Sequence, residues 1–405
     1  MGIPAVVPGG CGMDLSVLSG ALERHRTVQV VADSGAGLTT IARQVHADWP
    51  EAAVVQQDPV AHITYLRETV VEEVAIGLEQ RGVPRPEMEQ RCARVLAAAG
   101  LSDLAERHPA RLSGGQTRRL AIACVAVLEP RILLLDDPLA GLDPHSATQV
   151  LHLLAALPSR VVLLGTRVVG LDSVAGRDSV VLTLRDGKLA EGPPDPHVPR
   201  LPSRVAPVGD PLDLGEVVAT RGSEGRKWWQ FRARTEPVFT AGPIRLGVQP
   251  GGVVWLRGAN GAGKTTLLRA MAGLDGNPGL GRTRGVSASL ALQRAADQVA
   301  ESTVGAFVAP ASVGELGVDP EMHPLDLPAA GLRLAQLTQV FGQRRQLVLL
   351  DEPDVGLDAP ARDRAHAIIA SGLARGRAVV LTCHDETFAA EVGKYAQVSE
   401  VWLQG

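Results

Sequence analysis

A nine-residue loop has the composition of a phosphate-binding site. Residues 258–266 read Gly-Ala-Asn-Gly-Ala-Gly-Lys-Thr-Thr and fit the pattern G-x-x-x-x-G-K-[ST], known as Walker A. The glycines let backbone N–H groups approach phosphate oxygens, and the positive end of the following helix points at them. Lys264 is expected to reach the β- and γ-phosphates of a nucleotide, and the Thr265 hydroxyl to ligate Mg²⁺. The predicted nucleotide-binding residues of this loop are Gly258, Asn260, Gly261, Gly263, Lys264, Thr265 and Thr266.

An earlier segment repeats this loop without the lysine. Residues 32–40 read Ala-Asp-Ser-Gly-Ala-Gly-Leu-Thr-Thr, and Leu38 stands where the lysine would be. Backbone amides and a hydroxyl that could ligate Mg²⁺ are nevertheless kept, which leaves nucleotide binding by this loop open. The residues concerned are Gly35, Gly37, Thr39 and Thr40.

Two acidic residues follow an apolar run in the half that contains Lys264. Leu-Val-Leu-Leu at residues 347–350 predicts a buried strand, and Asp351 and Glu352 come directly after it. A carboxylate in this position can hold Mg²⁺ through water, which is the role expected of Asp351. Glu352 is the expected general base for an attacking water. A solvated acidic turn is the alternative.

Two further residues are candidates for the catalytic site. His384 follows another predicted strand, residues 378–381, although a lone histidine is often structural. Gln293 follows a short apolar run and could contact Mg²⁺ or the attacking water, with a surface glutamine as the alternative. The predicted catalytic residues are Glu352, His384 and Gln293.

Three motifs occur twice along the chain at a common offset of 215 residues. A repeated offset in several motifs indicates two copies of one domain plan. The pairs are Leu-Ser-Gly-Gly-Gln at 112–116 with Leu-Pro-Ala-Ala-Gly at 327–331, Asp-Asp-Pro at 136–138 with Asp-Glu-Pro at 351–353, and Gly-Leu-Asp at 141–143 with Gly-Leu-Asp at 356–358.

The architecture expected from these repeats is α/β. The apolar runs before both loops and both acidic pairs predict parallel strands, and stretches such as 86–99 and 361–374 predict helices between strands. The chain of 405 residues suits two domains of about 200 residues each. Residues 191–213 are rich in proline without a hydrophobic period, so they predict a semi-extended linker. The predicted segments are domain 1–195, linker 196–212 and domain 213–405.

Residues 112–116 are followed by Thr-Arg-Arg and by a helical run from Leu120 to Leu128. Ser113 and the glycine amides can cap this helix and bind an anion there. In this context the pentapeptide resembles the signature motif of ATP-binding cassette (ABC) ATPases. The resemblance covers nearly the whole chain. It implies two tandem P-loop NTPase domains, each a RecA-like sheet core with a helical subdomain.

In this family, domains pack head to tail, with ATP held between the Walker A loop of one and the signature of the other. The resemblance therefore implies a composite site that uses both halves of the chain, with ATP and Mg²⁺ as cofactors. It would combine Lys264, Thr265, Gln293, Asp351, Glu352 and His384 with Ser113, Gly114, Gly115 and Gln116.

The other composite site would combine the Leu38 loop with residues 327–331, and both of these segments depart from the family pattern. It lacks the lysine, most of the signature and the glutamate, because Asp137 is one methylene shorter. Arg167 stands at the histidine position. Each charge-assisted hydrogen bond contributes about 1.5–3 kcal/mol, so these losses together predict far slower hydrolysis. The residues of this degenerate site are Gly35, Gly37, Leu38, Thr39, Thr40, Gln57, Asp136, Asp137 and Arg167.

Composition argues against several other classes of protein. Forty basic and 44 acidic residues give a net charge of −4, and aromatic residues make up 3%, so nucleic acid is not an expected partner. The four cysteines lack C-x-x-C spacing and are expected to be free thiols in a reducing cytosol. No signal peptide or membrane-spanning run is apparent, so we expect a membrane role to require a partner.

The first half has a more specific resemblance. Gln-Asp-Pro at 57–59, the segment 68–79 and Gly-Val-Pro at 82–84 resemble ATPases of energy-coupling factor (ECF) transporters and their cobalt-uptake relatives. This implies import of a vitamin or transition-metal ion with a transmembrane coupling protein and a substrate-binding subunit. It also implies a cytoplasmic location, peripheral on the membrane. The segment from Gln293 to Leu327 is shorter than its counterpart, so the main docking contact is expected on the first half.

One other class of function and one ligand contact remain open. The alternative function is a soluble tandem ABC ATPase acting in translation or regulation. Ribosome-acting relatives have a long charged linker and two intact signatures, which this chain lacks. An aromatic side chain before the Walker A loop stacks on adenine in many ABC domains. Trp228, Trp229 and Phe231 are candidates, with core or linker packing as the alternative.

Overall fold

The chain forms two compact units, residues 1–197 and residues 198–405, here called the first and second units. The computed structural model describes residues 13–169, 178–221, 239–259, 261–308, 313–314 and 316–403. None of the helices in these ranges is both long and apolar enough to cross a bilayer.

The first unit is built on a six-stranded sheet in the order β2-β3-β4-β1-β5-β6. Every neighbouring pair is parallel except β5 with β6, which closes the edge as a hairpin. The runs of Val, Ile and Leu predicted as strands are buried because helices cover both faces. The strands are β1 (Thr27–Val31), β2 (Ala52–Val55), β3 (Ile132–Asp136), β4 (Arg160–Gly165), β5 (Ser179–Arg185) and β6 (Lys188–Glu191).

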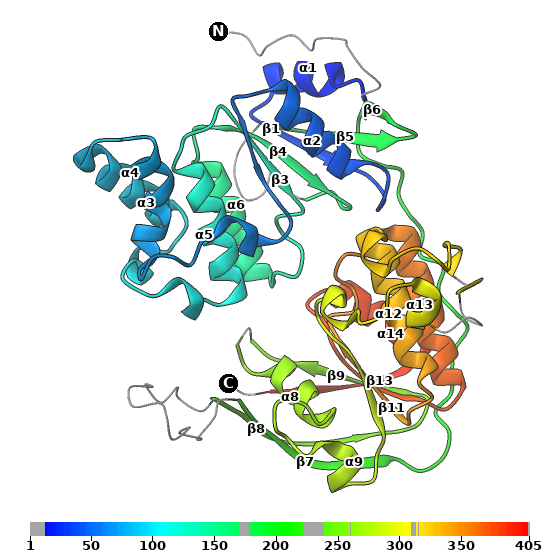
Figure 1. Ribbon diagram of the computed structural model, residues 1–405. Helices are drawn as coiled ribbons and strands as arrows, with labels where there is room; N and C mark the ends of the chain where they lie inside the picture. The colour runs from blue at the N-terminus through cyan, green and yellow to red at the C-terminus, as the bar shows by residue number, and fades with distance from the viewer. Residues whose placement is uncertain are drawn as a thin grey trace. The chain divides into compact units, whose positions relative to one another are not determined.

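Alternate strand residues of the first unit point into two separate cores. One core lies against α1 (Ser16–Arg24) and α2 (Leu38–Asp48). The other lies against α5 (Gly114–Ala126) and α6 (Pro144–Ala156), and it continues into a helical subdomain (Figure 1). This subdomain contains α3 (Val70–Gln80), α4 (Arg85–Ala98) and the 3-10 turns η1 (Pro59–His62), η2 (Ser102–Leu104) and η3 (Pro109–Arg111).

The second unit has a five-stranded parallel sheet in the order β10-β11-β12-β9-β13. An antiparallel pair, β7 and β8, packs with α8 over one of its faces. The strands are β7 (Leu212–Arg221), β8 (Phe239–Val248), β9 (Gly252–Arg257), β10 (Ala288–Ala291), β11 (Leu347–Asp351), β12 (Ala378–Thr382) and β13 (Gln397–Trp402).

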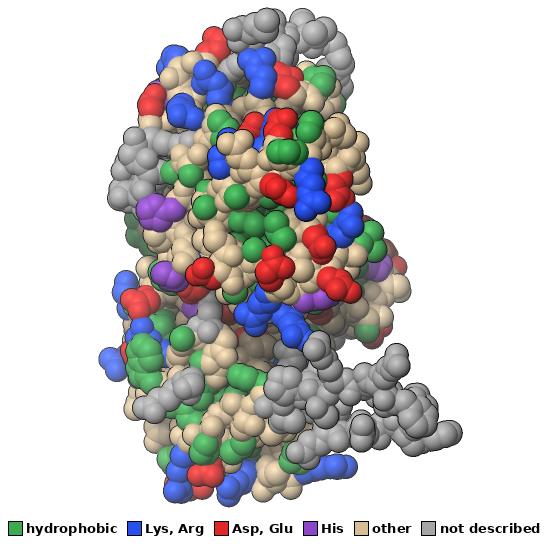
Figure 2. Space-filling model, turned by 90° about the vertical axis from the view of Figure 1, so that its left-hand side faces the viewer, with side chains coloured by type: hydrophobic (Ala, Val, Ile, Leu, Met, Phe, Trp, Pro, Cys, Tyr) green, Lys and Arg blue, Asp and Glu red, His purple; other side chains and the backbone are tan. Residues whose placement is uncertain are grey.

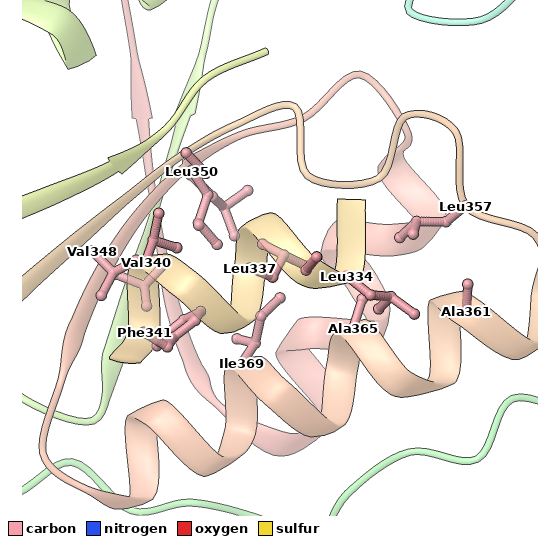
Figure 3. Close-up of a cluster of buried hydrophobic side chains, with 14 of the residues drawn as sticks. Leu334, Leu337, Val340, Phe341, Val348, Leu350, Leu357, Ala361, Ala365 and Ile369 are labelled. Atoms are coloured by element: carbon pink, nitrogen blue, oxygen red, sulfur yellow. The ribbon is translucent and has the colours of Figure 1, made fainter. Parts of the chain in front are cut away.

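Helices cover the other face of the second sheet. Figure 3 shows Leu334, Leu337 and Val340 of α12 packed between Val348 and Leu350 of β11 and the apolar side of α13. The helical subdomain has fewer residues here than in the first unit, since 34 positions separate Gln293 from Leu327 and 55 separate Gln57 from Leu112. The helices are α8 (Lys264–Met271), α9 (Gly279–Thr283), α10 (Val304–Val308), α12 (Ala329–Gly342), α13 (Ala359–Ala374) and α14 (Glu386–Tyr395), with the 3-10 turns η4 (Ala295–Gln298) and η5 (Pro324–Asp326).

The segment predicted as a linker contains neither helix nor strand from residue 192 to 211. Part of it is held against the second unit by its backbone. Val205 N donates to Tyr395 O at 2.7 Å, and Val208 N donates to Pro250 O at 2.8 Å. Residues 198–211 therefore belong to the second unit as an ordered strap on its surface.

Candidate functional site

The complete phosphate-binding loop connects β9 to α8. Gly263 has a φ of +96° and immediately precedes the first residue of α8. A Cβ atom at Gly263 would lie 2.4 Å from Ala241 Cβ, so only glycine fits this turn. Lys264 is 8% exposed, and its Nζ donates to Gly258 O at 2.7 Å and to Ala259 O at 3.1 Å. The ammonium therefore lies over the loop that the sequence predicts to hold phosphate. Asn260 lies outside the described residues.

The residues predicted to ligate Mg²⁺ come together beside this loop. Thr265 Oγ1 donates to Asp351 Oδ1 at 3.2 Å, and Thr382 Oγ1 donates to the same oxygen at 2.8 Å. Burial raises the pKa of Asp351, whereas the hydrogen bonds from Thr382 and Thr265 oppose that rise. A carboxylate and a hydroxyl are the hard oxygen donors that Mg²⁺ prefers, so these residues fit the ion.

The other two predicted catalytic residues, Gln293 and His384, both contact the carboxylate of Glu352. Gln293 Nε2 donates to Glu352 Oε2 at 2.8 Å, and His384 Nε2 lies 3.2 Å from Glu352 Oε1. The backbone of Glu352 is also fixed, with φ at +50° and its N–H donating to Thr382 O and Oγ1. Glu352 is 6% exposed, so its carboxylate has a defined place at the end of β11.

Sequence reasoning missed a buried arginine that holds the Gln293 segment. Arg333 of α12 is 4% exposed and donates to the carbonyl oxygens of Gln293 at 2.5 Å and Leu292 at 3.1 Å. Its counterpart in the first unit, Arg118 of α5, donates to Gln57 O at 2.7 Å. The common offset of 215 residues, which also separates the paired motifs, could have identified these two arginines.

The signature segment of the first unit caps a helix as predicted. Ser113 is the N-cap of α5, and Ser113 and Gln116 form a reciprocal capping box. Gly115 leaves room for a neighbouring helix, since a Cβ atom there would lie 2.6 Å from Ser146 Oγ. Ser113 and Gly114 are exposed at the helix start, where the free N–H groups can meet an anion. In the second unit the N-cap of α12 is Pro328, which provides no side-chain hydrogen bond.

The degenerate loop keeps the backbone turn of the complete one. Gly37 has a φ of +112° and precedes Leu38, the first residue of α2. Gly35 also has positive φ, as does Gly261 in the complete loop. Thr39 and Thr40 lie in the first turn of α2. A cavity of about 510 Å³ lies beside the degenerate loop. It is lined by Thr39, Ala42, Arg43, His46, Val54, Gln56, Gln57, Asp58 and Asp136.

The acidic pair of the first unit is more loosely held than that of the second. Gln57 Nε2 lies 3.5 Å from Asp137 Oδ2, compared with 2.8 Å for Gln293 and Glu352. Burial raises the pKa of Asp137 to about 6, although the charges of Arg118 and Arg167 oppose the rise. Burial also raises the pKa of Asp136.

An aromatic residue at the complete loop was not singled out from the sequence. Phe239 begins β8 and is 40% exposed. Its ring borders the loop, because a Cβ atom at Gly263 would lie 3.0 Å from Phe239 Cε1. The earlier candidates Trp228, Trp229 and Phe231 lie outside the described residues.

Comparison with known proteins identifies relatives of this chain. The family model described as ABC transporter matches residues 15–140 and 242–287. A protein of Streptomyces coelicolor named as an ABC transporter ATP-binding protein is 30% identical, over 84% of this chain and 76% of that protein. The energy-coupling factor transporter ATP-binding protein EcfA1 of Lacticaseibacillus paracasei is 37% identical, over 41% of this chain and 57% of that protein.

Solved structures support the tandem fold. An archaeal ABCE1, described as bound to the ribosome with Pelota, matches with a TM-score of 0.59 and 15% identity, over 94% of this chain and 74% of that chain. A protein named RNase-L Inhibitor matches with a TM-score of 0.56 and 14% identity, over 94% of this chain and 83% of that chain. At such identities the likeness extends to the fold alone. The relatives and the family model show that this chain is an ATPase of the ABC transporter ATP-binding protein family.

Proposed function

We propose that this ATPase is the energy-coupling subunit of an ECF-type ABC uptake transporter for a vitamin or a transition-metal ion, with one hydrolytic site. The observation that best supports hydrolysis at this site is the contact of Gln293 and His384 with the Glu352 carboxylate. The 37% identity to an ECF transporter ATP-binding protein supports the transporter class.

In this proposal the phosphates of ATP bind the 258–266 loop and Lys264. Thr265 and Asp351 would hold Mg²⁺, which neutralises phosphate charge when bound. Glu352 accepts the proton of the attacking water, and Gln293 and His384 orient its carboxylate and the water. Phe239 supplies an aromatic face for adenine beside the loop.

The first unit contributes to the same nucleotide through its signature. The free N–H groups at the start of α5 are suited to the γ-phosphate, with Ser113 and Gln116 as polar side chains beside them. We propose that Ser113, Gly114, Gly115 and Gln116 complete the site that contains Lys264, which requires head-to-tail pairing of the two domains in one chain. The Leu38 loop would then face the uncapped helix start at Pro328 and serve closure or regulation.

An apolar surface on the first unit is the proposed docking site for the membrane partner. Val60, Tyr65 and Leu66 are 46%, 37% and 83% exposed, and we call this stretch the 60–66 segment. Its backbone is anchored, since Thr64 N donates to the buried Glu73 of α3. The corresponding residues 294–303 of the second unit expose no large apolar side chain. Of these two corresponding segments, the one on the first unit exposes the apolar side chains, which supports docking there.

The charge pattern does not favour a nucleic-acid partner. On the described surface that Figure 2 shows, basic and acidic side chains lie interspersed with apolar ones. The formal net charge is −4. A ribosome-acting tandem ATPase remains the competing function, and the two functions differ in where the protein resides in the cell. In our proposal it is cytoplasmic and peripheral on the membrane.

Copurification distinguishes the two functions. The tagged full-length chain would be crosslinked in cells of its source organism, and its partners identified by mass spectrometry in membrane and ribosome fractions. We expect an integral transport protein together with a small membrane substrate-binding subunit. A pool bound to ribosomes with no integral partner would overturn the transporter proposal.

A further inference from the structure

A buried ionic network lies behind the turn that carries His384. Arg362 of α13 donates through Nη1 to Asp385 Oδ2 and through Nε to Glu391 Oε2, both at 2.6 Å. The Arg362 and Glu391 side chains are 11% and 6% exposed. One guanidinium thus joins the residue after His384 to the next turn of α14.

Both neighbours of His384 are fixed by such contacts. Before it, Cys383 O accepts a hydrogen bond from Trp255 Nε1 at 3.3 Å. After it, Asp385 Oδ1 caps α14 by accepting from Thr387 N and Phe388 N, so its other oxygen is the one that Arg362 binds. The His384 ring, which lies against Glu352, therefore projects from a turn anchored at both ends.

The network also ties this turn to the loop that follows Glu352. The helix α13 begins directly after that loop, with Asp358 as its N-cap, and Arg362 lies in its first turns. Glu391 also contacts His366, whose Nε2 lies 2.8 Å from Glu391 Oε2. The other ring nitrogen of His366 lies 3.0 Å from the Tyr395 hydroxyl. Arg362 consequently sets the position of the His384 turn relative to the element that leads from Glu352.

The first unit has apolar residues at the positions equivalent to Arg362 and His366. Ala147 and Leu151 stand at the offset of 215 residues from Arg362 and His366. In the turn after the strand, Thr166 stands at the position of His384 and Arg167 at that of Asp385, because Leu164 and Thr382 pair with the equivalent residues Asp136 and Asp351. The prediction from the sequence that Arg167 stands at the histidine position is therefore wrong, one residue too late. A buried ion pair is often no more stabilising than apolar residues of similar volume, so stability alone does not explain this network. Arg362 and His366 are therefore present in the unit that contains His384 and replaced in the unit that has no histidine at that position, although the two units share the same fold.

We propose that Arg362 is a positioning residue for His384, acting through Asp385. The inference rests on the proposed role of His384 in hydrolysis. Loss of Arg362 would release the turn, so that His384 spends less time in contact with Glu352. The turnover number would fall, whereas ATP binding would be retained because Arg362 bonds to Asp385 and Glu391 rather than to the described residues of the 258–266 loop.

A double-mutant cycle on the full-length chain tests this inference. We expect Arg362→Met to lower kcat about tenfold, which is about 1.4 kcal/mol of barrier, and to leave the KM for ATP within about twofold. In an His384→Ala background the same change should alter kcat by less than about twofold, because the two residues act as one unit. Arg362→Lys, which can reach only one carboxylate, should restore part of kcat.

Two further variants serve as controls. Arg364→Met removes an arginine of the same helix that donates to Leu316 O instead, and it should leave kcat unchanged. Arg362→Met with Glu391→Gln removes one buried anion along with the cation, in case the single variant fails to fold. An equal loss of kcat from Arg362→Met with and without His384 would overturn the positioning role. Wild-type kcat in His384→Ala alone would overturn the role of His384 itself, and this inference with it.

Discussion

The side-chain amide of Gln293 donates to the carboxylate of Glu352 at 2.8 Å, although Gln293 follows strand β10 and Glu352 follows strand β11. The contact is possible because β10 and β11 are parallel neighbours, so their carboxyl ends meet at one edge of the sheet. The equivalent pair in the first unit, Gln57 and Asp137, is 3.5 Å apart. The shorter aspartate thus holds the glutamine less closely than the glutamate does.

The lysine of the complete loop should dominate nucleotide affinity. We expect Lys264→Ala to weaken ATP binding by roughly tenfold to a hundredfold, since a charge-assisted hydrogen bond contributes about 1.5–3 kcal/mol. Leu38→Ala should change total turnover by less than about twofold, because its loop does not support hydrolysis. Fluorescent-nucleotide titration and a steady-state assay would measure both. A larger loss of turnover from Leu38→Ala would contradict this assignment.

Glycine at position 263 should be required for both shape and backbone angle. Gly263→Ala places a methyl group 2.4 Å from Ala241 Cβ at positive φ, so we expect it to destabilise the second unit by about 2 kcal/mol or more. Gly261→Ala is the matched control, because Gly261 also has positive φ but has no atom within 4 Å of the added carbon. Urea denaturation should show a clearly smaller effect for Gly261→Ala. Equal effects would mean that space at Gly263 is not limiting.

The central strands and the helix cap at Ser113 could be predicted from the sequence, whereas the long-range side-chain contacts could not. Apolar runs ending in Asp136 and Asp351 predicted the central strands because buried parallel strands are apolar on both faces. The serine at position 113 predicted its cap because capping is local. Arg333 was missed although its repeat at Arg118 marks it, because its partner Gln293 lies 40 residues away along the chain. Arg362 was missed because its partners also lie far along the chain, and Ala147 at the repeat position gives no signal. The strap at residues 198–211 was predicted only as a linker, since its backbone hydrogen bonds leave no periodic signal.

Stability should depend on pH through Asp137. Its pKa in the folded state, about 6, is above the unfolded value of about 3.9, so the folded state binds more protons between these two values. Asp137 therefore destabilises the fold above pH 6, and this effect is relieved as the pH falls. We expect Asp137→Asn to be more stable than the wild type at pH 8, with the difference shrinking as the pH falls through about 6. A difference independent of pH in urea denaturation would contradict the raised pKa.

The 60–66 segment should be needed for the membrane partner. Leu66→Asp places a charge on a side chain that is 83% exposed, so the isolated fold should tolerate it. Burying a leucine at an interface contributes about 1.5–3 kcal/mol, so we expect at least a tenfold loss of partner affinity. Val198→Asp is the control, because Val198 is similarly exposed, at 80%, on the other unit. Equal capture of the partner by the Leu66 and Val198 variants would contradict docking at this segment.

The central claim is that hydrolysis takes place at one site, where Glu352 is the general base. The direct measurement compares ATP turnover and ATP retention in Glu352→Gln and Asp137→Asn, each made in the full-length chain. We predict that Glu352→Gln abolishes turnover while retaining bound ATP, because the glutamine cannot accept a proton from water. Asp137→Asn should keep turnover close to that of the wild type. Equal losses in the two variants would contradict the one-site account.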